Sequence, residues 1–260
     1  MEMKNLLGAV LMASALSVFS VAAAAALPNR PTIILVHGAF AESASWNGVI
    51  EQLKNNGFKA VAAANPLRGV AFDAASVSAI IRSLSGPVVL VGHSYGGAVI
   101  TEAANSNSNV KALVYVAAFA PEKGESSLAL SGKFPGSTLG SALITVPSQD
   151  GGQDLYIDPE KFHAQFAADL KAQDAALMAA TQRPVSQAAL AETSGEASWR
   201  RIPSYAIYGS DDRNIPGDVL KFMAERAKSE KTVVLPGASH ALMISHAKEV
   251  AALIMDAASQ

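Results

Sequence analysis

Short apolar runs alternate with longer amphipathic segments along most of the chain. The runs predict six strands, at residues 32–36, 59–63, 88–91, 111–116, 204–208 and 231–235. A run such as Val88–Val91 is apolar throughout, which is typical of a parallel strand covered on both faces. Between the runs, apolar residues recur at helical spacing, as at Val77, Ile80, Ile81 and Leu84. Because parallel neighbours need a helix-length connection, this alternation predicts an α/β fold, with a six-stranded, mostly parallel sheet and helices on both faces.

The alternation is interrupted between the fourth and fifth strands. Residues 122–153 are rich in Gly, Ser and Pro with little periodicity, whereas residues 159–178 return to helical spacing. We therefore expect residues from about 121 to 202 to form a mostly helical insertion. It leaves the sheet at the carboxyl ends of the strands, where folds of this kind bind their ligands, so it is predicted to act as a lid.

The first 26 residues have the composition of an export signal. Lys4 precedes an uninterrupted run of apolar and small residues, Leu6–Val21, and the small residues Ala22–Ala26 follow. The alternative is a retained membrane anchor, because the run approaches the roughly 20 residues that span a bilayer. Its Ala and Ser content favours cleavage. We expect residues 1–26 to be a signal peptide and residues 27–260 to form one domain that is periplasmic or secreted.

The composition of the chain excludes several kinds of partner and catalytic group. The chain has 260 residues, which suits one large α/β domain, and its formal net charge is only −2. That charge favours neither a nucleic acid nor an anionic membrane as partner. The chain has no cysteine, which excludes disulfides, thiolate nucleophiles and thiolate metal sites. Covalent catalysis would need another side chain.

A serine follows the third predicted strand in a glycine-rich turn. Gly92, Ser94 and Gly96 fit the G-x-S-x-G pattern, in which a strained strand-to-helix turn exposes a nucleophilic serine. The strand before it and the helical spacing after it are the expected flanks. Neither of the common phosphate-loop patterns occurs here. The sequence thus predicts Ser94 as a nucleophile.

A serine nucleophile needs a base, an acid that orients the base, and donors for the oxyanion. Of the five histidines, only His240 follows the last strand and a candidate acid, in the chain order Ser, acid, His. The acid is expected after the fifth strand, where Asp211 and Asp212 are adjacent, and spacing does not choose between them. The expected backbone donors follow the nucleophile and the first strand. These are Tyr95 and Ala39, with Phe40 as the neighbouring alternative.

Five motifs occur along the chain in this order: His37-Gly-Ala-Phe-Ala41 followed by Trp46, Gly92-His-Ser-Tyr-Gly-Gly97, Val116-Ala-Ala-Phe-Ala-Pro121, Asp212-Arg-Asn-Ile-Pro216 and Ser239-His240. Together they resemble the α/β-hydrolase superfamily, and within it the small esterase and hydroxynitrile lyase branch. That branch includes plant methyl salicylate esterases and bacterial carboxylesterase-like proteins. The resemblance implies the α/β-hydrolase fold, with the lid inserted after the fourth strand. It also implies Asp212 rather than Asp211 as the acid, and Ala39 and Tyr95 as oxyanion donors.

Two positions limit the reaction that the resemblance implies. The plant lyases carry a lysine directly after the catalytic histidine, where this chain has Ala241, so cyanohydrin cleavage is disfavoured. Dehalogenases and epoxide hydrolases of the superfamily use Asp where this chain has Ser94.

We therefore expect an exported serine esterase that cleaves small or medium carboxylic esters through an acyl-enzyme. The catalytic residues would be Ser94, Asp212 and His240, with no cofactor and no metal. Its partner would be a small-molecule ester, with no nucleic acid and no stable membrane association after signal cleavage. Alternatives are a thioesterase or acyltransferase on the same triad, or a non-catalytic ligand-binding homologue. The sequence does not predict the oligomeric state.

Overall fold

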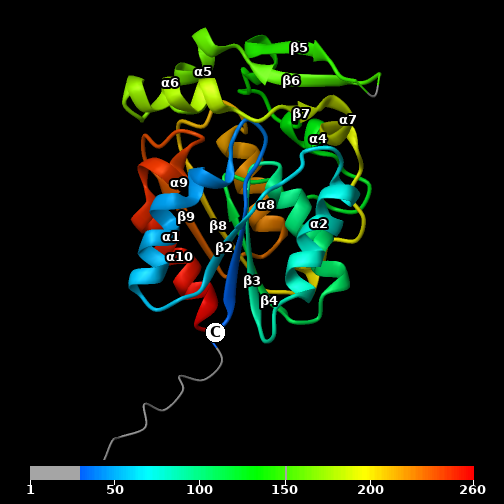
Figure 1. Cartoon of the computed structure of the whole chain (residues 1–260), viewed down its shortest axis with the longest axis vertical. Coiled ribbons are helices and arrows are strands. Elements are labelled where there is room, and N and C mark those ends of the chain that lie inside the picture. The colour runs from blue at the N-terminus through cyan, green and yellow to red at the C-terminus, as the bar shows by residue number, and fades with distance from the viewer. Residues whose placement is uncertain (1–29, 150) are drawn as a thin grey trace, which may run out of the picture.

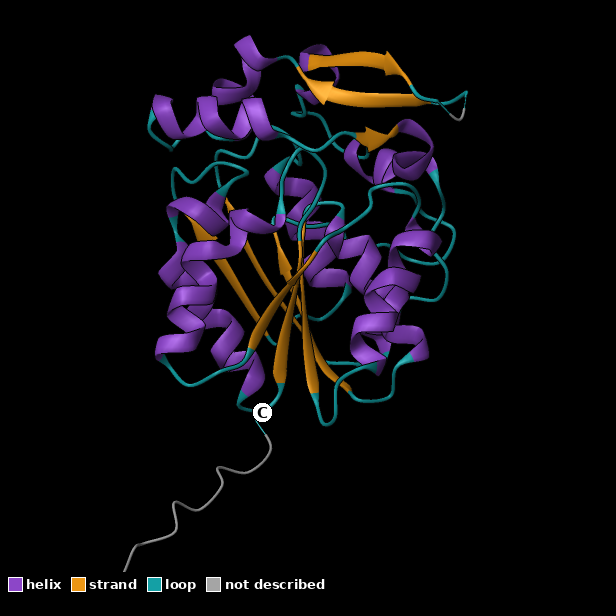
Figure 2. Ribbon diagram, viewed as in Figure 1, coloured by secondary structure: helices purple, strands orange, loops and turns teal. Residues whose placement is uncertain are grey.

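The computed structural model describes residues 30–149 and 151–260, and within them a six-stranded parallel sheet forms the centre of the fold (Figures 1 and 2). The strand order is β2-β1-β3-β4-β8-β9, and every neighbouring pair is parallel. The strands are β1 (Thr32–Val36), β2 (Ala60–Ala63), β3 (Val88–His93), β4 (Val110–Val116), β8 (Ser204–Gly209) and β9 (Lys231–Leu235). The predicted α/β-hydrolase sheet is confirmed. The predicted export signal at residues 1–26 lies outside the described residues.

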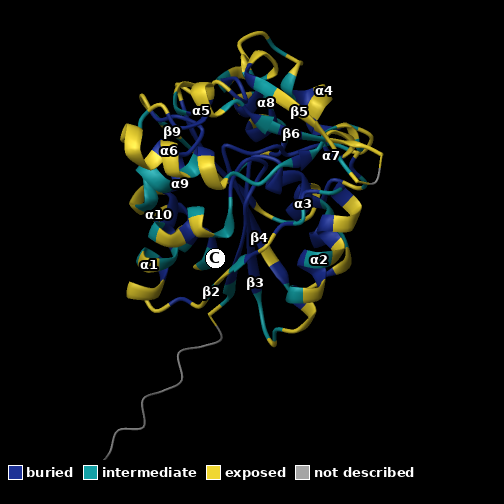
Figure 3. Cartoon of the chain, turned by 45° about the horizontal axis from the view of Figure 1, so that its top comes forward, coloured by how far each residue is buried: buried dark blue, intermediate teal, exposed yellow. Residues whose placement is uncertain are grey.

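Helices cover both faces of this sheet. Helix α1 (Asn47–Asn55) packs against α10 (Ala247–Ala258) on one face, and α2 (Val70–Arg82) packs against α3 (Gly96–Ala103) on the other (Figures 1 and 3). Helix α8 (Gly217–Arg226) follows β8. Every residue of β3 is buried, as the apolar run predicts for a strand between two helical layers.

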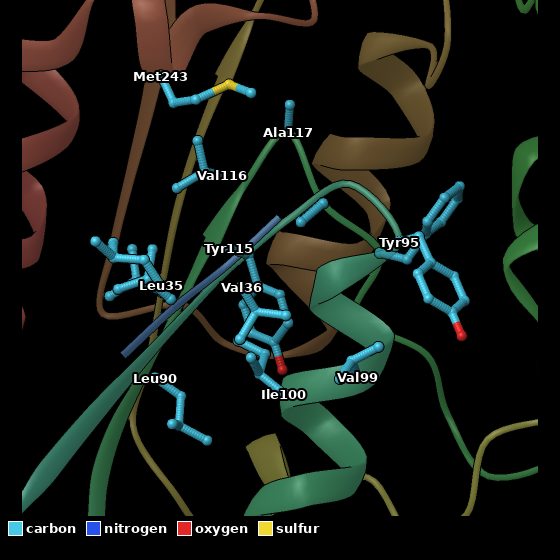
Figure 4. Packing of buried hydrophobic residues seen from close by; sticks show 14 of the residues in the cluster. Leu35, Val36, Leu90, Tyr95, Val99, Ile100, Tyr115, Val116, Ala117 and Met243 are labelled. Atoms are coloured by element: carbon cyan, nitrogen blue, oxygen red, sulfur yellow. The ribbon is translucent and has the colours of Figure 1, made fainter. Parts of the chain in front are cut away.

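Side chains from the sheet and from α3 interlock in the core. Figure 4 shows Leu90, Ile100 and Tyr115 between the strands and this helix. The Tyr115 hydroxyl lies 2.8 Å from the Thr101 hydroxyl, so the polar end of this buried ring is satisfied. The described residues also form four short 3-10 helices: η1 (Ser43–Trp46), η2 (Ala104–Ser106), η3 (Leu139–Ala142) and η4 (Ser198–Arg200). None of the helices in the described ranges is both long and apolar enough to span a bilayer.

The residues between β4 and β8 lie above the carboxyl ends of the strands (Figure 1). We call residues 121–202 the lid. Its helices are α4 (Ser127–Ser131), α5 (Pro159–Phe166), α6 (Ala172–Thr181) and α7 (Gln187–Ala191). It also contains an antiparallel sheet that the sequence pattern did not predict, made of β5 (Leu143–Pro147), β6 (Gln153–Ile157) and β7 (Val185–Ser186). Residues of β5 are largely exposed, so they lack the alternation of buried and exposed positions that usually marks a strand.

Two breaks separate helices that follow one another closely in the chain. The segment at residues 159–178, which has helical spacing, is divided between α5 and α6, and a second break at His246 separates α9 (Leu242–Ser245) from α10. Asp169 lies in the first break and accepts a hydrogen bond at 2.6 Å from the hydroxyl of Ser245, the last residue of α9. A hydrogen bond between distant segments thus joins the two breaks.

Charged residues fasten the lid to the core. The Glu192 carboxylate accepts the N–H groups of Val70 at 2.6 Å and Ala71 at 3.2 Å, at the start of α2. It supplies the N-terminal cap that Gly69, which has no side chain, cannot provide. Arg68 forms an ion pair of 2.7 Å with Asp154 of β6. Two points of the lid, Asp154 in β6 and Glu192 directly after α7, are thereby tied to the α2 region.

Candidate active site

Ser94 stands on a strained turn between β3 and α3. Its φ is 54°, in the left-handed region that a residue with a Cβ rarely adopts. Glycines allow the backbone to close tightly around it. A Cβ at Gly92 would lie 2.5 Å from the Gly96 carbonyl oxygen, and one at Gly97 would lie 2.2 Å from that of Phe119. The turn has the geometry that the glycine-serine pattern predicts.

Tyr95, directly after Ser94, is anchored by its side chain. Its hydroxyl donates to Asp73 of α2 at 2.9 Å, and both side chains are buried. Desolvation raises the pKa of both groups, and the N–H of Arg68 also donates to Asp73 at 3.1 Å. The turn is thus fixed from the α2 side.

A buried carboxylate and imidazole meet at the ends of β8 and β9. His240 Nδ1 lies 2.7 Å from Asp212 Oδ2, and the Asp212 side chain is fully buried. The other oxygen, Oδ1, accepts the N–H groups of Asn214 at 2.8 Å and Ile215 at 2.9 Å. Because the carboxylate only accepts, Nδ1 carries the hydrogen, which leaves the Nε2 lone pair of His240 available as a base.

The neighbouring aspartate has a different environment. Asp211 is exposed and accepts a hydrogen bond from the Ser210 hydroxyl at 2.7 Å. The structure therefore brings Asp212, and not Asp211, to the histidine.

Ser94 lies at the same edge of the sheet as His240, but no hydrogen bond joins them in the described residues. His240 Nε2 is buried and has no hydrogen-bond partner in that part of the chain. Contact between the two segments is made by His93, whose ring centroid is 4.7 Å from that of His240. Nucleophile–base hydrogen bonds are often long before substrate binds.

His93 also holds the backbone of His240. Its Nε2 donates to the His240 carbonyl at 3.0 Å. Burial holds the pKa of His93 well below its usual value, so the ring is neutral. His93 therefore links the turn that carries Ser94 to the loop that carries His240.

The loop after β1 presents backbone donors beside Ser94. The N–H groups of Ala39 and Tyr95 have no hydrogen-bond acceptor among residues 30–149 and 151–260, whereas the Phe40 N–H donates to the Arg183 carbonyl at 3.0 Å. A Cβ at Gly38 would lie 2.6 Å from the Ser94 Cβ, so this loop packs directly against the serine. Of the two predicted alternatives in this loop, Ala39 has the free donor.

His37 stabilises that loop. Its Nε2 accepts the Asn65 N–H at 3.0 Å, which leaves Nδ1 to donate to the Gly38 carbonyl at 2.9 Å. The Asn65 side chain donates in turn to the His37 carbonyl at 2.9 Å. Burial lowers the pKa of His37, which keeps the ring neutral. His37 and His93 are both hydrogen-bonding parts of the turns that carry them.

A cavity of about 380 Å³ opens above the serine. Its walls include Ser94, Ala39 and Tyr95, and none of the described residues that line it is charged. Most of the apolar wall comes from the loops after β1, β4 and β8 and from the lid: Phe40, Phe119, Leu128, Leu139, Leu143, Leu155, Leu190 and Ile215. Sequence patterns did not identify the lid leucines, because nothing local distinguishes a cavity wall from ordinary core.

Phe119 lines the cavity, whereas other large side chains of the lid lie outside its lining in the described part of the chain: Phe134, Tyr156, Phe162, Phe166 and Met178. Phe162 and Phe166 are fully buried and stacked with centroids 5.0 Å apart. The Phe166 ring also meets the His240 ring edge-on at 5.0 Å, so it supports the histidine from the lid side.

The lid also holds both residues that flank His240. The Phe166 carbonyl accepts the Ala241 N–H at 3.0 Å, and Asp169 accepts the Ser239 hydroxyl. Burial alone would raise the pKa of Asp169, but the hydrogen bonds from Ser239 and Ser245 outweigh it, and the pKa lies below its usual value. Asp169 has no motif around it, so no sequence pattern marks it as part of the site.

Comparison with known proteins gives matches over most of the chain. The model of the alpha/beta hydrolase family matches residues 33–253. The alpha/beta hydrolase nvfD of Aspergillus novofumigatus is 28% identical over 252 residues, covering 89% of this chain and 98% of that protein. The putative chloroplastic methylesterase 11 of Arabidopsis thaliana is 25% identical, covering 86% of this chain and 63% of that protein.

Solved structures share the fold. Polyneuridine aldehyde esterase superposes with a TM-score of 0.74 at 20% identity, covering 87% of this chain and 98% of that one. The Arabidopsis methylesterase MES16 superposes with a TM-score of 0.73 at 18% identity, covering 88% and 99%.

Proposed function

The chain belongs to the alpha/beta hydrolase family, and from that premise we propose that it is an exported serine esterase that cleaves small or medium carboxylic esters. One observation carries the proposal: the buried Asp212–His240 pair, with a free Nε2, lies at the same sheet edge as the strained Ser94 turn. The relatives named esterase or methylesterase agree with this reaction.

Each group has a defined part in the proposed reaction. The Ser94 hydroxyl attacks the ester carbonyl while His240 Nε2 takes its proton, and Asp212 stabilises the resulting imidazolium. The N–H groups of Ala39 and Tyr95 hydrogen-bond the oxyanion. The tetrahedral intermediate expels the alcohol, which receives the proton from His240, and an acyl-enzyme remains. Water, deprotonated by His240, then releases the acid.

The cavity supports the substrate size. Its volume of about 380 Å³ and its uncharged, largely apolar wall fit a neutral ester of modest size.

The proposal that the protein is exported rests on the composition of residues 1–26, with Lys4 before the apolar run. N-terminal sequencing of protein recovered from the periplasm or the medium tests it, and a retained N-terminus in the membrane fraction would contradict it.

Loss of the nucleophile is the direct test of the reaction. The purified protein and its Ser94→Ala variant are assayed against p-nitrophenyl esters of graded acyl length, and both are exposed to a fluorophosphonate probe. We expect hydrolysis and labelling by the native protein, and a fall in kcat of at least about 10³-fold in the variant. Normal hydrolysis by Ser94→Ala would refute the mechanism. A native protein that neither reacts with the probe nor turns over esters would instead be a binding homologue.

A further inference from the structure

Three serines of the lid line the cavity above Ser94, and one of them differs from the other two. Ser131 donates its hydroxyl to the Leu128 carbonyl at 2.9 Å, and Ser137 donates to the Asn214 carbonyl at 2.9 Å. The Ser127 hydroxyl is buried and has no hydrogen-bond partner in the described part of the chain. Ser127 as a residue is only 2% exposed, so water at the surface does not solvate it.

The Ser127 hydroxyl is not needed to cap the helix in which it lies. It is the first residue of α4, but the preceding Ser126 already caps this helix by accepting the Ala129 N–H at 3.1 Å. A buried hydroxyl without a partner destabilises the fold by the cost of its lost hydration, and native proteins carry few of them. Such a group in the wall of a reaction cavity is therefore a candidate for ligand recognition.

Other polar side chains of the wall contact solvent or protein. Thr145 and Gln187 are exposed to solvent, and Asn214 accepts a hydrogen bond from the Gln165 side chain at 2.7 Å. Since the other lid serines bond to carbonyls, Ser127 is the buried hydroxyl of the described lid wall that is left for a ligand.

We propose that Ser127 is a specificity-determining residue that hydrogen-bonds a second oxygen of the substrate, outside the scissile ester. This proposal rests on the esterase function proposed above. The substrate class is an uncharged ester with an apolar body and one further ketone, ether, hydroxyl or ester oxygen. It is uncharged because a carboxylate or an ammonium group would lose its hydration in a wall without a countercharge.

Pairs of esters that differ by one atom test this role. Each pair has the same length and leaving group, with a methylene in one member and an oxygen in the other. The oxygen is moved along the acyl chain in one series and along the alcohol in a second series. A hydroxyl that needs a partner disfavours the methylene analogue. We therefore expect one oxygen position at which the native protein prefers the oxygen ester by about tenfold in kcat/KM.

Three variants test whether the Ser127 hydroxyl causes that preference. In Ser127→Ala we expect the kcat/KM ratio of the two esters to fall to about one. Ser131→Ala and Ser137→Ala, which remove hydroxyls that are bonded to carbonyls, are expected to keep it. Labelling of Ser94 by the fluorophosphonate probe checks that each variant is folded and active.

Two results would overturn the proposal. In the first, the native protein shows no preference for the oxygen ester in either series. In the second, it shows such a preference, and Ser127→Ala keeps it. Both can occur in a working esterase, so they are distinct from failure of the function itself. A native protein that is neither labelled nor active on any ester would remove both proposals together.

Discussion

Replacing Asp212 by asparagine changes one atom of the candidate triad and tests its geometry. Oδ1 accepts two backbone N–H groups, from Asn214 and Ile215, so this position must remain an oxygen. The new amide NH₂ then faces His240 Nδ1, where Oδ2 now lies at 2.7 Å. Two donors would oppose each other unless the imidazole moves its hydrogen to Nε2. In that tautomer His240 cannot accept the proton of Ser94.

The size of the effect follows from this loss of the base. The same change in a Ser-His-Asp triad keeps the geometry and lowers kcat by about 10⁴-fold. At about 1.36 kcal/mol for each factor of ten, this is about 5.4 kcal/mol of lost transition-state stabilisation. Stability should change far less, by about 1–2 kcal/mol, because the amide oxygen keeps both backbone hydrogen bonds.

The assay compares kcat for a p-nitrophenyl ester in Asp212→Asn and in Asp211→Asn, with urea denaturation of both variants. Asp211 is the matched control, since it is adjacent but exposed and bonded to Ser210. We expect a loss of about 10⁴-fold in the first variant and less than twofold in the second. A folded Asp212→Asn protein with more than about a tenth of native kcat, or an equal loss in Asp211→Asn, would refute the tautomer argument.

Two further predictions concern stability, measured by urea denaturation. In Gly97→Ala the new Cβ would lie 2.2 Å from the Phe119 carbonyl oxygen, so we expect the free energy of unfolding to fall by more than about 2 kcal/mol. In the control Gly217→Ala the new Cβ meets nothing within 4 Å, so we expect a fall of less than about 0.5 kcal/mol. An equal loss in both variants would contradict the steric argument. Burial lowers the pKa of His93 and His37, so below about pH 6.5 the unfolded chain binds protons that the folded chain does not. Stability should therefore fall on acidification by up to about 1.4 kcal/mol per pH unit for each ring. The slope between pH 7.5 and 5 should be shallower in His93→Asn, and an unchanged slope would exclude His93 as a cause.

Local patterns were enough to predict the parallel sheet and the position of Ser94. Strand β3 is buried on both faces, so its apolar run is visible without knowledge of its neighbours. The Ser94 turn is local in part, since a Cβ at Gly92 would meet the Gly96 carbonyl oxygen within the turn, whereas Gly97 is required by the Phe119 carbonyl after β4. Chain order in such a sheet then indicated His240 and the pair of aspartates. The strand and the serine turn could be predicted because most of their physical cause lies within a few residues.

The tertiary structure decided the contacts between distant segments. Residues 211 and 212 have the same side chain, and only packing turns one carboxylate to His240 and leaves the other in solvent. Asp169 accepts a hydrogen bond from Ser245, which is 76 residues away, and so joins the break between α5 and α6 to the end of α9. The cavity wall, including Ser127, likewise depends on how the lid packs. Periodicity records whether a residue is buried, but the partner of a buried group depends on the geometry of the assembled chain.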